Sequence, residues 1–361
     1  TPSLESWDRA KSGHYTLARL AERYNDQQMP SVRVIDLATV AAGPLYPFSS
    51  PLLEAIEQRL KRDEQSILFL NHRGLASALL CLDCRRRVVS PDSQLPFTIH
   101  KSSSGSQYLL DHTSGIRADL PAACPHCGSI RLHAIGAGTQ KIEDLLKRVY
   151  PNARLLRADS DTMTHPEHMR LLLKKMREGQ ADILFGTQSV VKGLDLPDVT
   201  LAAVLVADIG LSLPHFRAGE RIFQLLTQLT GRSGRAQPGD VIIQTFRPDA
   251  AEVRFAAEHK TEEYLEQELK LRLHAQYPPA TKMIRLILRG QGAMQRAQQV
   301  SLELIKCAKE NDPSAKIGSA PTFFGGGKEW HVLVRSADPR KLLEEMNLED
   351  VVVDVDPIEC V

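Results

Sequence analysis

The sequence predicts an α/β fold in which one parallel sheet is interrupted by a metal-binding insertion and followed by a smaller α+β domain. Three observations predict this arrangement. Short apolar segments alternate with amphipathic segments up to residue 249, and two Cys-x-x-Cys pairs interrupt that alternation. A separate strand and helix pattern then occupies the C-terminal part of the chain.

Six short segments dense in Val, Ile and Leu are expected to form the strands of the sheet. They lie at 32–37, 67–71, 154–158, 183–186, 200–207 and 241–245. Amphipathic stretches expected to be helical lie between most of them, at 51–61, 141–149, 167–178 and 221–230. Apolar strands that alternate with such helices are typical of a parallel sheet covered on both faces.

The insertion carries four of the six cysteines, as the pairs Cys81/Cys84 and Cys124/Cys127. Each pair can form a tight knuckle, and two knuckles complete a closed Cys₄ site of the kind that holds structural zinc. A redox pair and unpaired core thiols are the alternatives. Because the segment is rich in Ser, Pro, Gly and Asp, we expect metal to hold it together in place of a core.

A charged helical run is expected at 250–275, and Pro278-Pro279 ends it. Beyond the prolines, strands are expected at 282–288, 316–318, 331–335 and 351–355, and helices at 294–309 and 339–346. The resulting order β-α-β-β-α-β is the split βαβ arrangement. The predicted division of the chain is therefore a sheet lobe at 1–77 and 134–249, a zinc-binding insertion at 78–133, a connecting helix at 250–277 and a C-terminal domain at 278–361.

Composition indicates an ordinary folded protein with more than one domain, since 361 residues with 42% hydrophobic content can build two cores. The formal net charge is +1, so any binding to DNA must depend on local basic patches. No apolar run is long enough to span a bilayer and no leader opens the chain, which favours the cytoplasm and no membrane partner. The chain begins with Thr1, which suggests that sequence is missing upstream.

A block at residues 228–235 indicates chemistry on a phosphoryl group. Arg232 and Arg235 lie three residues apart beside glycines that let the backbone approach a ligand, and such a pair can stabilise charge on a transferring phosphate. The cradle for the phosphates is missing, because Gly-x-x-x-x-Gly-Lys-Ser/Thr occurs nowhere and no Asp-Glu-x-His or Asp-Glu-x-Asp string follows a strand to hold magnesium. The chain therefore carries half of a nucleotide site.

Several motifs together resemble the PriA family of replication-restart DNA helicases, also called primosomal protein N′, over its C-terminal half. The resemblance covers essentially the whole chain. The matching strings are Thr1-Pro2, Phe69-Leu70-Asn71-His72-Arg73-Gly74, Gly136-Ala137-Gly138-Thr139-Gln140, Asp159-x-Asp161-Thr162, Gly186-Thr187-Gln188 with Lys192-Gly193, Phe216-Arg217-x-x-Glu220-Arg221, Gln228 to Arg235, and Val353-Asp354-Val355-Asp356-Pro357.

The resemblance implies a RecA-like second lobe of a superfamily 2 helicase, ATP-dependent and 3′-to-5′ in direction, that acts on forked and single-stranded DNA. Primosome proteins and single-strand-binding protein are the implied partners, and the bacterial cytoplasm with its nucleoid is the implied location. ATP and magnesium would bind only with a first lobe. The chain alone is expected to be inactive.

The resemblance also implies roles for individual residues. Arg232 and Arg235 would reach the nucleotide phosphates as catalytic residues with Gln228 beside them, and Gly231 and Gly193 would let the backbone approach. The residues expected to follow the single-stranded DNA backbone are Thr187, Gln188 and Lys192. Hydroxyl and ammonium groups suit phosphate oxygens and ignore base identity.

The insertion departs from the family pattern, which usually nests two Cys₄ sites. The outer ligands are Cys81, Cys84, Cys124 and Cys127. The inner ones align with Ser90, Ser93, Asp111 and Ser114, which are poor zinc ligands beside thiolates. We therefore expect one structural zinc, and no second ion rebuilt on His100 and His112. Arg85-Arg86-Arg87 is either a phosphate contact or a solvated basic turn.

Two functions from different classes remain open. The first is a helicase of which this chain supplies the C-terminal half, and the second is a stand-alone zinc-bearing DNA-binding or adaptor protein without ATPase activity. A translocase acting on RNA is a weaker third reading. The block at residues 228–235 contains Arg232 and Arg235, which we call the phosphate clamp. Its retention favours the helicase, because a pure binding module has no use for arginines directed at a phosphate.

Overall fold

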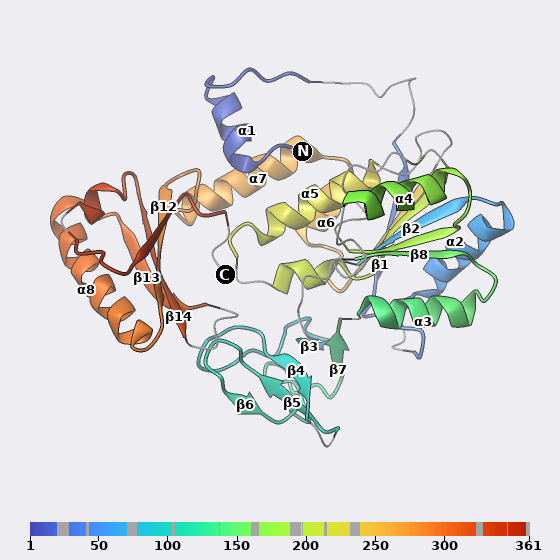
Figure 1. Ribbon diagram of the computed structural model, residues 1–361, viewed down its shortest axis with the longest axis horizontal. Helices are drawn as coiled ribbons and strands as arrows, with labels where there is room; N and C mark the ends of the chain where they lie inside the picture. Colours follow the sequence, from blue (N-terminus) through green and yellow to red (C-terminus); the bar gives the residue numbers. More distant parts are fainter. Residues whose placement is uncertain are drawn as a thin grey trace.

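The computed structural model describes residues 1–19, 29–40, 43–70, 78–102, 105–136, 138–159, 166–187, 196, 198–212, 215–231, 239–322, 328–344 and 346–358. Figure 1 shows a lobe built on a parallel sheet, with the cysteine-bearing insertion on one side of it and the C-terminal domain beside both. Within the described residues, no helix combines the length and apolar character that crossing a bilayer requires.

The lobe contains six parallel strands in the order β1-β11-β10-β2-β9-β8. Their bounds are β1 Ser31–Asp36, β2 Gln65–Phe69, β8 Leu155–Ala158, β9 Ile183–Gly186, β10 Val199–Val204 and β11 Asp240–Thr245. The central strands β2, β9 and β10 are buried along their whole length, which explains their continuous apolar sequence. The prediction of a parallel sheet is confirmed.

Helices cover both faces of this sheet, as expected. One face packs against α2 and α3, and the other against α4, α5 and α6. The bounds are α2 Ser50–Lys61, α3 Thr139–Val149, α4 Pro166–Arg177, α5 Ala218–Thr230 and α6 Ala251–Ala257. Helix α2 shows why the sequence begins a helix there, because Ser49 accepts a hydrogen bond from the Leu52 N–H and Pro51 occupies the first turn.

The insertion is an antiparallel sheet of five short strands in the order β6-β5-β4-β3-β7. Their bounds are β3 Ala78–Cys81, β4 Thr98–Lys101, β5 Gln107–Leu110, β6 Arg117–Ala118 and β7 Leu132–Ile135. The expectation that metal replaces a core in this segment is wrong. Five buried apolar side chains form a small core of its own, namely Leu79, Val88, Phe97, Ile99 and Leu109.

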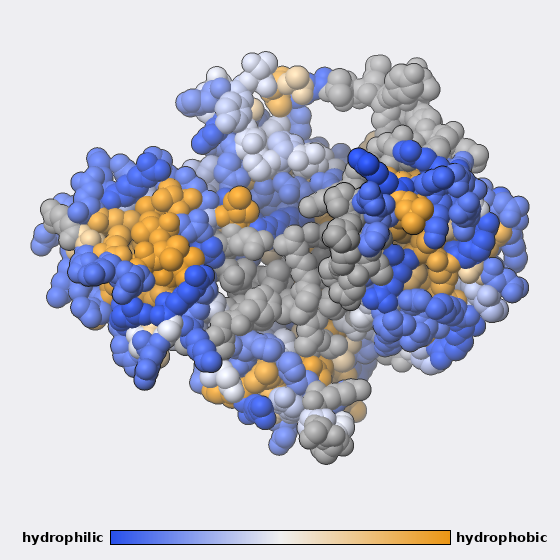
Figure 2. Space-filling model, in the orientation of Figure 1, coloured by the Kyte–Doolittle hydropathy of each residue, from blue (hydrophilic) through white to orange (hydrophobic). Residues whose placement is uncertain are grey.

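The C-terminal domain is an antiparallel sheet in the order β13-β14-β12-β15 with one long helix. The elements are β12 Lys282–Arg289, α8 Ala293–Asn311, β13 Lys316–Pro321, β14 Glu329–Ser336, η4 Lys341–Leu343 and β15 Val352–Val355. This is the expected split βαβ order, except that the second helix shrinks to the three-residue turn η4. Figure 2 shows an apolar patch on the surface of this domain.

The charged run at 250–275 forms two helices and not the single one expected. Helix α6 ends at Ala257 and α7 extends over Thr261–His274. Between them His259 adopts a positive φ of 57°, which an uninterrupted helix cannot contain. A further helix, α1 (Leu4–Lys11), was not predicted, and it lies against α7.

A buried ion pair joins these parts of the chain. Arg272 of α7 donates to Glu220 of α5 at 3.0 Å, and both side chains are only 3% exposed. The second carboxylate oxygen of Glu220 accepts the Leu4 N–H at the start of α1, also at 3.0 Å. One carboxylate therefore holds α1, α5 and α7 together.

The last described residues of the chain attach to the same region. Arg217 and Arg221, beside Glu220 on the lobe, donate to the carbonyl oxygen of Ile358 at 3.3 and 2.7 Å. The ring of Phe216 stacks on Tyr277, which precedes the C-terminal domain, at a centroid distance of 4.9 Å. The sheet lobe and the C-terminal domain are therefore joined by polar and aromatic contacts.

We expect Glu220→Ala to lower the free energy of unfolding by about 3 kcal/mol, because it removes the buried carboxylate that faces Arg272 and leaves that guanidinium with Glu268 as its remaining anionic partner. Urea denaturation followed by circular dichroism measures this change. The matched control is Glu178→Ala, which removes an exposed pair with Lys174 and should cost about 0.5 kcal/mol or less. Equal losses for the two variants would contradict the stabilising role of the buried pair.

Candidate metal centre and strand-edge site

Four cysteine sulfurs converge at the base of the insertion. Cys81 Sγ lies 3.6 Å from Cys127 Sγ, and Cys84 Sγ lies 3.7 Å from Cys124 Sγ. All four sulfurs lie within 4.8 Å of one another, and in the described part of the chain they are the one group of three or more such ligands. A tetrahedral ion with bonds of about 2.3 Å places its sulfurs about 3.8 Å apart. The four cysteines could therefore hold a metal ion.

Two similar turns position these sulfurs. In the first, the Arg85 N–H donates to the Cys81 carbonyl oxygen, and in the second the Gly128 N–H donates to the Cys124 carbonyl oxygen. The residue that closes each turn has a positive φ, 59° at Arg85 and 74° at Gly128. Glycine adopts that conformation at no steric cost, which is why the second knuckle carries it.

The environment of the thiols favours a bound cation. Burial acts against ionisation of Cys81, but the backbone N–H groups of Cys84 and Asp83 outweigh it and lower the pKa of Cys81 to about 7. Burial raises the pKa of Cys84 to about 12, and the neighbouring thiols add to that effect. Four thiolates this close repel one another, so a metal ion must displace protons as it binds.

Two of the residues aligned with the inner ligands, Ser114 and Asp111, are hydrogen-bonded to each other. Ser114 Oγ donates to Asp111 Oδ2 at 2.6 Å, and the Thr113 N–H donates to Asp111 Oδ1 at 2.9 Å. Burial acts to raise the pKa of Asp111, but the Ser114 and Ser90 hydroxyls outweigh it and lower that pKa. These side chains therefore form a polar network around one buried carboxylate.

His100 and His112 lie beside this network. Their Nε2 atoms are 3.0 Å apart, and Nε2 of His100 lies 3.1 Å from the Thr98 hydroxyl. Burial first, and then the neighbouring His100, lower the pKa of His112. The two imidazoles therefore share a hydrogen bond, which requires a proton on only one of the facing nitrogens.

Two of the three arginines after the first knuckle are neither phosphate contacts nor solvated residues, because they are paired with groups of the lobe. Arg85 forms a bidentate pair with Asp36 at the end of β1, with N–O distances of 2.8 and 2.7 Å. Arg87 donates to the carbonyl oxygen of Asp208 in η3 (Ala207–Ser212) at 2.8 Å, and burial lowers the pKa of Arg87 to about 10. Of the three, Arg86 alone is exposed. Two of these arginines therefore fasten the insertion to the lobe.

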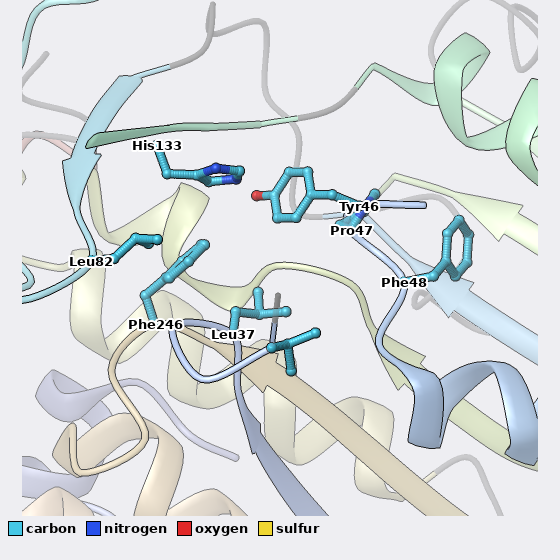
Figure 3. Close-up of a pocket in the computed structure, with 8 residues that line it drawn as sticks. Leu37, Tyr46, Pro47, Phe48, Leu82, His133 and Phe246 are labelled. Atoms are coloured by element: carbon cyan, nitrogen blue, oxygen red, sulfur yellow. The ribbon is translucent and has the colours of Figure 1, made fainter. Parts of the chain in front are cut away.

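Aromatic side chains complete this joint. Figure 3 shows Tyr46 from the lobe and His133 from β7 directed toward one another, and their ring centroids are 4.5 Å apart. Phe246, directly after β11, closes the space beneath them, which leaves a cavity of about 10 Å³. Burial raises the pKa of Tyr46, so its hydroxyl stays protonated. The insertion is thus packed on the lobe and not attached through a free linker.

The carboxyl edge of the parallel sheet carries the described part of the predicted DNA site. Thr187 follows β9 directly, and its N–H donates to the Ala158 carbonyl oxygen of β8 at 3.0 Å. Asp159 is buried at the end of β8 and accepts from Thr139, the first residue of α3, at 2.7 Å. The N-terminus of α3 therefore lies at this edge, and its N-cap Gly138 has no side chain to satisfy the first N–H groups.

Part of the predicted phosphate clamp can be placed. Gln228 is exposed on the last turn of α5, and Gly231 forms the C-cap of that helix. The clamp arginines Arg232 and Arg235 lie outside the described residues, as do Gln188, Lys192 and Gly193. The structure therefore leaves the predicted ligands of the phosphates and most of the DNA contacts as predictions.

Sequence reasoning missed two residues that organise this region. Glu220 was read only as part of a matching motif, although its carboxylate joins three helices. Asp36 was not singled out in the expected strand at 32–37, and it anchors the insertion through Arg85. A signal was present for Glu220, because an acidic residue on the apolar face of an amphipathic helix requires a buried partner.

The chain has clear sequence relatives, although no family model matches it. It is 41% identical over 281 residues to the replication restart protein PriA of Bacillus subtilis, a match that covers 77% of this chain and 34% of the relative. It is 40% identical over 314 residues to the PriA protein of Chlamydia muridarum, covering 85% and 41%. The chain thus spans less than half the length of these curated relatives, an extent consistent with the C-terminal half.

Solved structures give weaker matches. The helicase domain of Pyrococcus furiosus Hef is 15% identical with a TM-score of 0.28, and the match covers 58% of this chain and 28% of that one. The C-terminal domain of the DEAD-box protein Dbp5 is 12% identical with a TM-score of 0.32, covering 67% and 98%. These low scores add nothing to the sequence matches, which show that the chain is a homologue of the replication restart protein PriA.

Proposed function

We propose that this chain supplies the C-terminal half of an ATP-dependent 3′-to-5′ DNA helicase that acts in replication restart at stalled forks. The observation that carries the proposal is the 41% identity to a replication restart protein over most of the chain. The parallel sheet lobe and the convergent cysteines support it, because both correspond to parts that the sequence motifs predicted.

In this proposal the sheet lobe contributes the second wall of the nucleotide site. Helix α5 presents Gln228 and Gly231 at its end and leads directly into Arg232 and Arg235. The arginines would stabilise negative charge on the phosphates of ATP, held with magnesium by a first lobe. Gly193 would allow close backbone approach to the nucleotide.

DNA would follow the carboxyl edge of the sheet. Thr187 lies at that edge beside the N-terminus of α3, whose unpaired N–H groups attract phosphate. Gln188 and Lys192 would extend the same track along the single strand. Forked DNA, primosome proteins and single-strand-binding protein are the proposed partners, and the bacterial cytoplasm is the proposed location.

The insertion would carry one structural zinc ion on Cys81, Cys84, Cys124 and Cys127. The spacing of the four sulfurs suits a tetrahedral ion. Four protein ligands complete the coordination of such an ion and leave no position for a reacting water. The zinc would therefore stiffen both knuckles, including the first one, from which Arg85 and Arg87 reach the lobe. Its role would be structural and not catalytic.

Joining this chain to a PriA first lobe and assaying forked-DNA unwinding tests the proposed function. We expect Arg235→Ala to lower DNA-stimulated ATP hydrolysis by a factor on the order of 10³, as for other arginines that stabilise a transferring phosphoryl group. Arg62→Ala is the matched control, because Arg62 is exposed after α2 at the opposite edge of the sheet. An unchanged rate for Arg235→Ala would remove the clamp assignment.

The isolated chain provides a second test. We expect negligible ATP hydrolysis with forked DNA, because the chain has no Gly-x-x-x-x-Gly-Lys-Ser/Thr segment to hold the phosphates. A coupled assay of phosphate release measures this. DNA-stimulated turnover by the isolated chain would show that the phosphate site lies elsewhere. DNA binding without turnover after addition of a first lobe would favour the adaptor function.

Elemental analysis of the purified chain should give about one zinc per chain, because one Cys₄ set is present. Cys124→Ala should lose the metal, whereas Cys307→Ser should retain it, since Cys307 lies on α8 of the C-terminal domain. Zinc binding should release protons near pH 7, where Cys84 is still a thiol, and affinity should fall as pH is lowered. A value near two ions per chain would contradict the single site.

A further inference from the structure

The edge of the C-terminal sheet formed by β15 has no further strand beside it in the described part of the chain. Strand β15 is the last strand in the sheet order, and its pairing there is with β12. The Asp356 N–H donates to the Met283 carbonyl oxygen at 2.9 Å, which fixes the pairing of β15 on β12. Backbone groups alternate in direction along an antiparallel strand, so the N–H and C=O groups of Val353 and Val355 are directed away from β12.

Apolar side chains accompany this edge. Val352, Val353 and Val355 are 51%, 41% and 40% exposed, which is unusual for valines in a strand. Natural proteins usually protect an open edge with lysine, proline or a bulge. Strand β15 is short and its one charged side chain, Asp354, is paired with Arg285, but the strand has no lysine, proline or bulge, and Pro357 comes only after it ends.

The segment that carries the edge is acidic, although Arg285 pairs with Asp354 and Arg9 of α1 interacts electrostatically with Asp356. From Leu342 to the end of the chain there is no lysine or arginine, although the segment contains seven acidic residues. Glu349, Asp350 and Asp356 are exposed. Asp354 pairs with Arg285 on the neighbouring strand at 2.6 Å, so that one charge is already balanced within the sheet. A ligand of this edge should therefore be positively charged.

We propose that the outer edge of β15 binds an extended peptide segment of a partner protein in which apolar residues alternate with lysine or arginine. The segment adds a fifth strand to the sheet, through backbone hydrogen bonds to Val353 and Val355. Its apolar side chains cover the exposed valines and its cations lie near the exposed carboxylates. A second copy of this chain does not suit the edge, because two acidic edges repel one another.

This edge of β15 is separate from the predicted DNA site at the carboxyl edge of the parallel sheet and from the four cysteines. The inference does not depend on ATP hydrolysis. Titrating the isolated chain into a fluorescein-labelled peptide of alternating valine and lysine tests it by fluorescence anisotropy. We expect saturable binding that weakens as salt is raised. A matched peptide with glutamate in place of lysine should bind at least about tenfold more weakly, because like charges oppose pairing across strands.

Val353→Pro removes an outward N–H while leaving the inward pairing of β15 intact, so it should weaken peptide binding at least about tenfold. Val353→Thr keeps that N–H and should bind within about twofold of the unchanged chain. Far-UV circular dichroism verifies that both variants fold. Three results would overturn the proposal: no binding of the lysine peptide, equal binding of the glutamate peptide, or unchanged binding by a folded Val353→Pro variant. Self-association that Val353→Pro abolishes would assign the edge to a second copy instead.

Discussion

The carboxylate of Glu220 is the constraint on which the arrangement of the chain depends. It accepts from Arg272 and from the Leu4 N–H, so α1, α5 and α7 meet at one buried group. Burying a charge costs free energy unless the charge is paired. Any arrangement that separated Glu220 from Arg272 while both stayed buried would therefore be disfavoured. If α7 moved away, Glu220 would lose its cation, although it would still accept the Leu4 N–H of α1. The position of the C-terminal domain is therefore linked to the lobe by electrostatics.

The insertion is attached to the lobe by contacts other than the buried Glu220 pair. Its knuckles direct four sulfurs to one point, but its attachment to the lobe comes from Arg85 and Arg87, which flank the exposed Arg86. The same turn thus provides two of the sulfurs that could hold a metal ion and also the docking contacts. A small core and the network around Asp111 support the part of the insertion farther from the sulfurs. Metal binding and interdomain attachment are therefore adjacent in sequence but physically distinct.

Much of the fold could be predicted from sequence because it depends on local patterns. Buried parallel strands require continuous apolar runs, and the two Cys-x-x-Cys pairs carry their own geometry. The partners of Arg85 and Arg87 could not be predicted, because Asp36 and Asp208 lie far away in the chain. The break at His259 also escaped prediction, since a single left-handed residue has no strong compositional signal. For the clamp at Arg232 and Arg235, sequence remains the source of the assignment.

Helix α5 is fixed at its beginning by Glu220 and ends at Gly231. Its 13 residues make a rod about 20 Å long. A rigid rod that pivots at one end magnifies motion at the other, so a tilt of about 5° at the pivot displaces the far end by nearly 2 Å. A tilt of α5 imposed at Glu220 would thus reach residues 228–231 as a displacement comparable to the rise of one helical residue.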